Sequence, residues 1–295
     1  MDDVLMQDGS DPRPTKKKGA WRLVVPATLL GLIVAAACFA PLIAPYDPYA
    51  QDLAARLMPP IWEDGGSISH LLGTDDLGRD ILTRIMYGAQ VSLGVGILAV
   101  LCRMVSGVVI GLIAGYYGGP LRTFFMRIGD VQLALPALVL AIGIIAALGP
   151  SATNVIIVLA VAGWILYARL VVSQVMILRH QEFIASAKLL GASDLRILAK
   201  HLLPNIAPTI IVFASLDLGV MMLTEGSLSF IGLGVQPPQP SWGGMAAEGR
   251  ALISTAWWIA TLPGAALVLT VSVVNILGEQ LRDHLDPRLD TSRNN

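Results

Sequence analysis

The chain has too little charge for a typical soluble protein. Only 14% of its 295 residues are Asp, Glu, Lys or Arg, whereas a soluble domain carries about 25%. The formal net charge of -1 offers no excess of positive charge for binding nucleic acid. Hydrophobic residues make up 55% of the sequence. The shortage of charge and the excess of apolar side chains together predict a membrane protein.

Sequence signatures of catalysis and metal binding are also missing. The two cysteines, Cys38 and Cys102, both lie in apolar runs, and the four histidines are never paired at ligand spacing. The sequence contains no H-E-x-x-H, no G-x-S-x-G and no G-x-x-x-x-G-K-[ST] motif. We therefore expect no catalytic residue, no metal and no cofactor, and no ATP bound through a P-loop of this chain.

Long apolar runs are what the sequence has instead. A helix that crosses the hydrocarbon core of a bilayer needs about 20 apolar residues. The runs of suitable length are Val24–Ala44, Val91–Gly115, Val131–Gly149, Val155–Val172, Ile206–Leu223 and Trp257–Leu277, and the fifth continues through mixed residues to Phe230. The sequence therefore predicts an all-α membrane protein with six transmembrane helices.

The first run has an alternative interpretation as a cleaved signal peptide. It follows a basic segment, and "VAAAC" ending at Cys38 resembles a lipoprotein cleavage box. The apolar residues continue beyond Cys38 as "FAPLIAP", which makes the run longer than the apolar region of a signal peptide. This length favours a retained membrane anchor.

The basic residues predict the orientation. Fifteen of the 20 Lys and Arg residues lie in segments that six crossings place on one side, and cytoplasmic segments are enriched in Lys and Arg. Both termini of this multi-pass membrane protein are therefore expected in the cytoplasm. The expected segments are a cytoplasmic tail 1–22, a first transmembrane helix 23–44, an extracytoplasmic loop region 45–88, a core transmembrane domain 89–281 that includes a cytoplasmic loop 179–205, and a cytoplasmic tail 282–295.

The 179–205 loop contains "EFIASAKLLGASDLRILAKHLLPN", which has the pattern of two amphipathic helices joined by a glycine. Gly191 follows the last apolar residue of the first helix and suits a left-handed cap. Ser193 can cap the second helix, which we expect Pro204 to stop. The expected apolar faces are Phe183, Ile184, Ala187 and Leu190 in the first helix, and Leu195, Leu198, Ala199 and Leu202 in the second. Such a pair either lies on lipid headgroups or docks on a cytoplasmic partner.

The same stretch resembles the EAA loop of ATP-binding-cassette (ABC) importer permeases. Positions that match the family pattern are Ser186, Ala187, Gly191, Leu203 and Pro204. The chain departs from the pattern where Ala185 replaces the acid and Ser186 replaces an alanine. The dipeptide/oligopeptide (peptide/nickel) branch of the family commonly has an acid three residues earlier, where Glu182 stands in this chain.

Three further stretches resemble the second permease subunit type of that branch. They are "LLGTDDLGRDILTRIMYGAQVSLGVG" at 71–96, "LSFIGLGVQPPQPSWGGM" at 228–245 and "LRDHLDPRLD" at 281–290. The resemblance covers roughly residues 23–290 and implies a type I ABC importer permease fold. It implies a non-catalytic subunit that forms half of a translocation pore for di- or oligopeptides.

The resemblance also implies partners. A second, homologous permease would complete the pore, one or two cytoplasmic ATPases would bind below it, and an extracytoplasmic solute-binding protein would deliver the cargo. The residues that would couple this chain to an ATPase are Glu182, Ser186, Ala187, Gly191, Ala192 and Pro204. Related branches carry nickel, opines or glycosides, and a stand-alone secondary transporter or a non-transporting membrane scaffold are the rival classes.

Charged residues within the spans are costly in lipid and should face protein or water. Arg103 interrupts the second span, while Asp217 and Glu225 lie in the fifth. We consider Arg103, Asp217, Glu225 and Ser227 as candidates for the translocation path or its gate, and hydrogen bonding between helices is the alternative. We expect Glu225 to face the partner permease near the outer end of the pore. The sequence does not reveal whether Arg103 pairs with either acid.

Two outer segments, "GTDDLGRD" and "PSWGG", carry candidate contacts to the solute-binding protein. The residues are Asp75, Asp76, Arg79 and Trp242, and the alternative is that they only stabilise local loops.

Two other patterns concern packing and placement. Gly107, Gly111 and Gly115 have the spacing that lets membrane helices approach closely, with a gating role as the alternative. Aromatic residues near span ends, including Tyr116 and Tyr117, suggest an interfacial belt.

Overall fold

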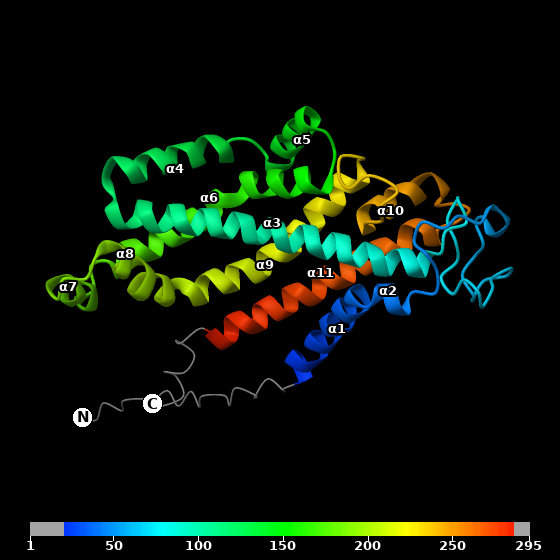
Figure 1. Ribbon diagram of the computed structural model, residues 1–295, viewed down its shortest axis with the longest axis horizontal. Helices are drawn as coiled ribbons and strands as arrows, with labels where there is room; N and C mark the ends of the chain where they lie inside the picture. Colours follow the sequence, from blue (N-terminus) through cyan, green and yellow to red (C-terminus); the bar gives the residue numbers. More distant parts are fainter. Residues whose placement is uncertain (1–20, 286–295) are drawn as a thin grey trace, which may run out of the picture.

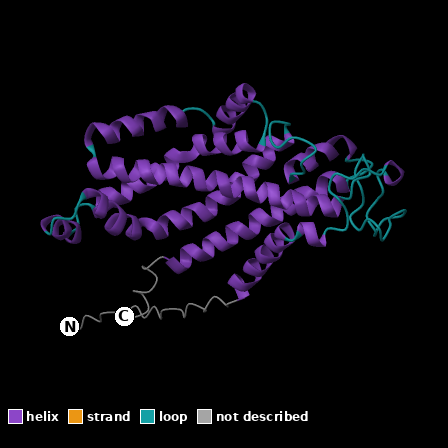
Figure 2. Cartoon of the chain, viewed as in Figure 1, coloured by secondary structure: helices purple, strands orange, loops and turns teal. Residues whose placement is uncertain are grey.

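The computed structural model describes residues 21–285, and nearly all of its regular structure is helical (Figure 2). Among these residues the only β-type pairing is an isolated bridge between Thr74 and Asp80. The α-helices are α1 (Trp21–Cys38), α2 (Ala40–Ile43), α3 (Ile81–Tyr117), α4 (Gly119–Leu133), α5 (Ala137–Leu148), α6 (Ala152–Leu178), α7 (Glu182–Leu189), α8 (Asp194–Arg196), α9 (Leu203–Phe230), α10 (Trp242–Glu248) and α11 (Trp258–Leu285). Short 3₁₀ helices cover Leu53–Ala55 and Gly249–Leu252, and a π-helix covers Ile197–Leu202. The expected tail residues 1–20 and 286–295 lie outside the described part of the chain.

Each of the six expected spans corresponds to helical structure. Within residues 21–285, four helices are long and apolar enough to cross a membrane: α3, α6, the continuous helix Asp194–Phe230, and α11. The pair α4 and α5 can form a fifth crossing, and the apolar part of α1, Val24–Cys38, is shorter. The long helices run along the long axis of the molecule (Figure 1). The expectation of an all-α membrane protein is confirmed, while the side on which each end lies remains a prediction.

The third span differs most from expectation. In place of one helix over Val131–Gly149, α4 and α5 meet at an angle of 87°. The break falls before Pro136. In a continuous helix the ring of this proline would clash with the carbonyl four residues earlier, and proline has no N–H to donate to that carbonyl. Gly118 and Gly119 both have positive φ, +69° and +54°, and make a tight turn from α3 to α4. The residues between spans two and three that were expected to form a loop are therefore helical.

The helix α3 begins earlier than expected. The carboxylate of Asp80 caps its first turn by accepting a hydrogen bond of 2.8 Å from the Thr83 N–H. Residues 81–88, which were assigned to the loop region 45–88, therefore belong to a helix of 37 residues. This helix reaches from the 45–80 loop at one end of the molecule to the 179–205 loop at the other (Figure 1).

Glycines bring α3 and α6 into close contact. A Cβ atom added at Gly107 would lie 2.6 Å from the Tyr167 Cβ, and one added at Gly111 would lie 2.7 Å from the Val171 Cβ. Real Cβ atoms essentially never approach so closely, so only glycine allows this distance between the backbones. The glycine spacing is accounted for by packing within the chain, as the packing interpretation predicted.

Candidate functional site

The 179–205 loop lies at one end of the molecule, where α7 extends beyond the ends of the neighbouring long helices (Figure 1). Gly191 ends α7 with φ = +78°. The Gly191 N–H donates to the Lys188 carbonyl at 3.0 Å, and the Ala192 N–H donates to the Ala187 carbonyl at 3.0 Å. These two bonds define a Schellman motif. The predicted left-handed cap at Gly191 is confirmed.

The second half of the 179–205 loop does not end where expected. Ser193 caps α8 by accepting a hydrogen bond of 3.4 Å from the Arg196 N–H. Pro204 does not stop the helix, because a continuous helix runs from Asp194 to Phe230. A π-helical segment precedes the proline, and the Leu203 N–H donates to the carbonyl of Leu198, five residues earlier.

This wider turn explains how the proline is accommodated. An α-helical turn would place the proline ring against the carbonyl four residues before it. The Asn205 side chain also donates to the His201 carbonyl at 2.6 Å, within the turn that contains the proline. The sequence "LPN" therefore marks a π-turn inside a helix, and the expectation of a stop at Pro204 was wrong.

The apolar residues of the 179–205 loop divide into a buried and an exposed set. Ile184, Ile197 and Leu202 are 0–1% exposed and pack with buried residues of α3 and α6. In contrast, Leu189 is 89% exposed, Leu190 88% and Leu195 75%. The expected apolar faces were therefore partly wrong, since they included two of these three. We call Leu189, Leu190 and Leu195 the loop tip.

The other residues of the family pattern take different positions around α7. Glu182 and Ser186 are exposed, with Glu182 as the first residue of the helix. Ala187 is buried and Ala192 half-buried on the side that faces the bundle. The structure therefore brings the small residues of the pattern against α3 and α6, and leaves its polar residues on the surface.

Side chains from the end of α3 hold the 179–205 loop. The Tyr116 hydroxyl donates to the Asp194 carboxylate at 2.6 Å, and the Tyr117 hydroxyl donates to its other oxygen at 3.2 Å. Lys188 lies 5.0 Å from the centre of the Tyr116 ring. The Arg179 guanidinium donates to the Gly115 carbonyl at 3.1 Å. Sequence reasoning missed these contacts, because tyrosines at a span end suggested only an interfacial position.

Arg103 pairs with Asp217 inside the helix bundle. Nη1 of Arg103 lies 3.2 Å from Oδ1 of Asp217, and the Tyr167 hydroxyl donates to Oδ2 of Asp217 at 3.0 Å. The two charged residues are 3% and 7% exposed. This answers the question that the sequence left open. Both residues also line a cavity of about 360 Å³ between α3, α4, α5, α6 and α9.

Glu225 does not have the position expected from the sequence. It is 0% exposed and accepts a hydrogen bond of 2.7 Å from the Ser229 hydroxyl, with the hydroxyls of Ser92 and Ser241 nearby. The side chain is therefore enclosed by its own chain, and the expectation that it faces a partner permease was wrong. Ser227 is exposed and donates to the Leu223 carbonyl at 2.7 Å.

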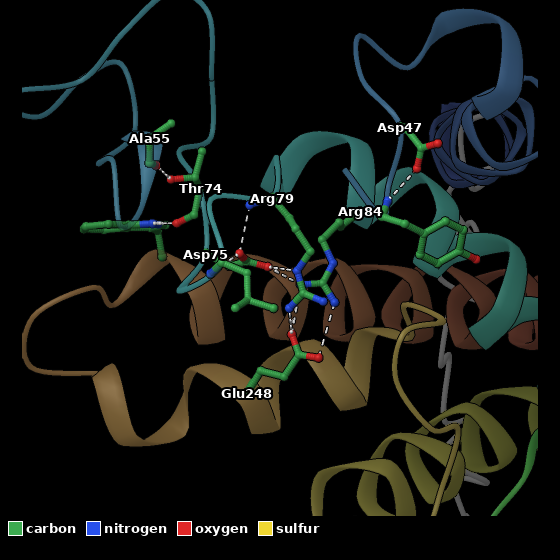
Figure 3. A network of polar contacts seen from close by, with 10 residues as sticks. Asp47, Ala55, Thr74, Asp75, Arg79, Arg84 and Glu248 are labelled. Atoms are coloured by element: carbon green, nitrogen blue, oxygen red, sulfur yellow. Dashed lines mark hydrogen bonds and ion pairs between the residues drawn. The ribbon is translucent and has the colours of Figure 1, made fainter. Parts of the chain in front are cut away.

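Two of the expected docking residues belong to a buried ion cluster (Figure 3). The Asp75 carboxylate accepts from Nε of Arg79 at 2.6 Å and from the Arg84 guanidinium. Both arginines also donate to Glu248, at 3.1 Å from Arg79 and 2.9 Å from Arg84. We call Asp75, Arg79, Arg84 and Glu248 the Asp75 cluster. It ties the start of α3 to α10.

Burial contradicts the docking expectation for three of its four residues. Asp75 is 0% exposed, Arg79 6% and Trp242 2%. Trp242 donates from its ring nitrogen to the Ile85 carbonyl at 2.9 Å, so it packs α10 onto α3. These residues stabilise local structure, as the alternative interpretation held, and only Asp76 is partly exposed.

Comparison with known proteins now identifies the family. Residues 107–291 match the family model described as "Binding-protein-dependent transport system inner membrane component". Residues 24–60 match the model of the "N-terminal TM domain of oligopeptide transport permease C".

Relatives of similar length extend this match to nearly the whole chain. The "Di/tripeptide transport system permease protein DppC" of Pseudomonas aeruginosa is 43% identical over 88% of this chain and 85% of the relative. The "Probable D,D-dipeptide transport system permease protein DdpC" of Escherichia coli is 39% identical over 97% of this chain and 98% of the relative. The "Glutathione transport system permease protein GsiD" of Pectobacterium atrosepticum is 42% identical over 88% of this chain and 84% of the relative.

The fold agrees with these relationships. A chain of the MetNI methionine ABC transporter, solved in inward-facing conformations, is similar with a TM-score of 0.56 and 17% sequence identity. The similarity covers 69% of this chain and 96% of the MetNI chain, and it shows the ABC importer permease fold. The family match, the relatives and the fold agree, and the chain belongs to the inner membrane components of binding-protein-dependent transport systems.

Proposed function

We propose that the chain is one half of the translocation pore of an ATP-driven importer of short peptides. The names of its relatives refer to the transport of di- and tripeptides, D,D-dipeptides or glutathione, and they support this cargo class. A second, homologous permease completes the pore, a solute-binding protein delivers the peptide, and one or two ATPase subunits supply the energy. The same family of permeases with nickel, opine or glycoside cargo is the alternative.

The observation that carries the proposal is the exposed loop tip on a firmly held 179–205 loop. The three leucines of the loop tip are 75–89% exposed. Large apolar side chains that are exposed together to water are unusual unless they contact a partner. The helix α7, which contains Leu189, lies at the end of the molecule, beyond the ends of the neighbouring long helices and not along the side of the bundle (Figure 1). A helix on lipid headgroups would lie in the plane of the membrane. This position favours a protein partner, and the loop tip is the contact that we assign to the ATPase.

The remainder of the 179–205 loop suits the transmission of movement. The Schellman motif at Gly191 fixes the direction of α7 relative to α8, and the Tyr116–Asp194 bond fastens α8 to the end of α3. A partner that moves the loop tip must therefore also move α3 or break these contacts. Coupling between sites requires two alternative arrangements of packed elements, and the proposal assigns such a change to the contacts between the 179–205 loop and α3.

The substitution Gly191→Val tests the proposal. A Cβ at position 191 meets no atom within 4 Å, so the substitution acts through the backbone angle of +78° alone. We expect the transporter to assemble, while transport falls at least tenfold and ATP hydrolysis no longer responds to the loaded binding protein. Both quantities are measured on the complete transporter in proteoliposomes.

Gly149→Val is the matched control. Gly149 has a φ of +85°, and a Cβ there also meets no atom within 4 Å, but it joins α5 to α6 away from the 179–205 loop. The control should keep the coupling between hydrolysis and transport. Normal coupling in Gly191→Val, or equal losses in both variants, would contradict the role assigned to the loop.

A further inference from the structure

A cavity of about 360 Å³ lies beside the bend between α4 and α5. Its lining is mostly apolar, with Leu159, Leu166 and Phe213 among the larger side chains, and its polar residues are Arg103, Asp217 and Thr224. Sites for small molecules are typically about 300–1,000 Å³, largely apolar, with a few well-placed polar groups. The cavity has the size and the lining of a binding site for a small molecule.

The backbone next to the cavity is interrupted. Leu133 ends α4 and Ala137 begins α5, and both residues line the cavity. Within the hydrocarbon region, non-helical backbone is tolerated only where it is buried in protein or lines a water-filled space. Transporters commonly place their substrate sites at such broken helices near the middle of the membrane. The interrupted backbone therefore borders the cavity, which is the arrangement that this rule requires if the cavity is filled with water.

The charged groups on the cavity wall are not fully satisfied within the chain. Nε of Arg103 is buried and has no hydrogen-bond partner among the described residues. Nη2 of Arg103 reaches the Gly163 carbonyl at 3.3 Å, and its Nη1 reaches Asp217 at 3.2 Å. A buried donor without a partner costs about 1–3 kcal/mol. An ionisable residue within a membrane span that leaves a donor free is a good candidate for contact with a ligand.

We propose that this cavity is a transit site for the transported peptide, at which Arg103 binds its free carboxylate and Asp217 its free ammonium group. The proposal rests on the function proposed above. Without peptide, Arg103 and Asp217 pair with each other. When a short zwitterionic peptide binds, each of them pairs instead with the oppositely charged end of the peptide, so the net charge in the cavity stays zero. Tyr167, which donates to Asp217 at 3.0 Å, keeps this carboxylate in position. The apolar walls contact the side chains of the peptide with little selectivity.

Protection of a cysteine at position 224 tests the proposal. Thr224 lines the cavity and is partly exposed, and Thr224→Cys is placed in a chain whose native cysteines are replaced, Cys38→Ala and Cys102→Ala. The complete transporter, with binding protein and ATPases, is treated with a small charged thiol reagent during ATP turnover. We expect labelling to slow at least threefold when Ala-Ala dipeptide is present. N-acetyl-Ala-Ala-amide, which lacks both charges, should give no protection.

The double substitution Arg103→Gln with Asp217→Asn distinguishes peptide binding by these two residues from a purely structural role of their ion pair. It removes both charges together, so neither is left buried without its partner. We expect this variant to assemble and hydrolyse ATP but to lose protection and transport. Wild-type protection and transport in the double variant would overturn the proposal, because a merely structural pair is replaceable by two amides.

The remaining outcomes are also informative. If dipeptide stimulates hydrolysis and transport normally while Thr224→Cys is never protected or never labelled, the transit site is wrong and the proposed function stands. If dipeptide causes neither stimulation nor transport in the otherwise intact complex, the proposed function fails first. Should the double variant not assemble, Arg103→Lys keeps the charge but removes the planar donor group, and unchanged protection there would count against carboxylate binding by Arg103.

Discussion

Removing one negative charge from the Asp75 cluster should destabilise the end of the molecule where α3 begins and α10 packs against it. Asp75 is 0% exposed and accepts four hydrogen bonds: two from the backbone N–H groups of Leu77 and Arg79, and two from the side chains of Arg79 and Arg84. In Asp75→Asn one oxygen becomes an NH₂ group. Whichever oxygen is replaced, the new NH₂ group faces two N–H groups that had donated to that oxygen. The guanidinium groups of Arg79 and Arg84 then share the single carboxylate of Glu248.

The size of the effect follows from burial. Breaking a buried ion pair by removing one partner costs about 3–5 kcal/mol, because the remaining charge stays buried. The arginines are 2% and 7% exposed at their side chains, so water cannot replace the lost carboxylate. For chains of this size, each kcal/mol lowers the midpoint of thermal unfolding by about 2–4 °C. We therefore expect Asp75→Asn to lower the midpoint by roughly 6–20 °C.

The neighbouring residue provides the control. Asp76 is partly exposed, and the structure shows no ion pair for it within residues 21–285. Asp76→Asn should therefore change stability by no more than about 0.5 kcal/mol. Unfolding is followed in detergent by tryptophan fluorescence, because Trp242 and Trp258 are buried close to the cluster. Equal midpoints for the two variants would refute this account of the cluster, and so would a loss confined to Asp76→Asn.

Two further predictions concern the contacts that hold the 179–205 loop and the orientation of the chain in the membrane. Tyr116→Phe removes the hydrogen bond of 2.6 Å to Asp194 and should reduce transport per ATP hydrolysed by several-fold while assembly is kept. Tyr117→Phe removes a longer bond of 3.2 Å to the same carboxylate and should have a smaller effect. A larger effect of Tyr117→Phe would contradict the role of Asp194 as the anchor of α8. Single cysteines at Ser67 and Ser193, in a chain without Cys38 and Cys102, should react with impermeant reagents from opposite sides of the membrane, and reaction from the same side would exclude the six-span topology.

Local sequence patterns were sufficient wherever the determining contacts are local. The cap at Gly191, the serine cap at Ser193 and the close approach of helices at Gly107 and Gly111 each depend on residues within one or two turns, or on the absence of a side chain. Such features leave a signal that can be read from spacing alone. The long apolar runs predicted helices for the same reason.

Helix boundaries were predicted less well where proline or glycine acts together with its neighbours. Pro136 breaks a span but Pro204 does not, although both interrupt apolar sequence. The difference lies in the preceding turn: the π-helical segment before Pro204 is wider than an α-helical turn and accommodates the proline ring. A hydropathy pattern does not contain this information, because it averages over residues whose hydrogen bonds differ.

The errors at Asp75, Trp242 and Glu225 share a single physical cause. Polar residues at membrane depth or in an outer loop require partners, and the sequence correctly indicated that requirement. It did not indicate that the partners come from the same chain, some of them nearby in the sequence and others more than a hundred residues away. Glu248 reaches Arg79 across 169 positions, and the Trp242 N–H reaches the Ser92 hydroxyl across 150.

The segment around Glu225 shows how residues of two separate stretches enclose a polar side chain. The Ser229 hydroxyl donates to Glu225 and accepts a hydrogen bond from the Val235 N–H. The backbone of Gly226 approaches Gly243 so closely that a Cβ atom at Gly243 would lie 2.6 Å from the Gly226 Cα. Two stretches that look unsuited to lipid when taken separately, "TEGSLSF" and "PSWGG", are therefore each other's environment. Arg103 and Asp217 also pair with each other within the chain, but unlike Glu225 they line the cavity of about 360 Å³. That difference, and not polarity at membrane depth as such, is why we place the transit site at Arg103 and Asp217 and not at Glu225.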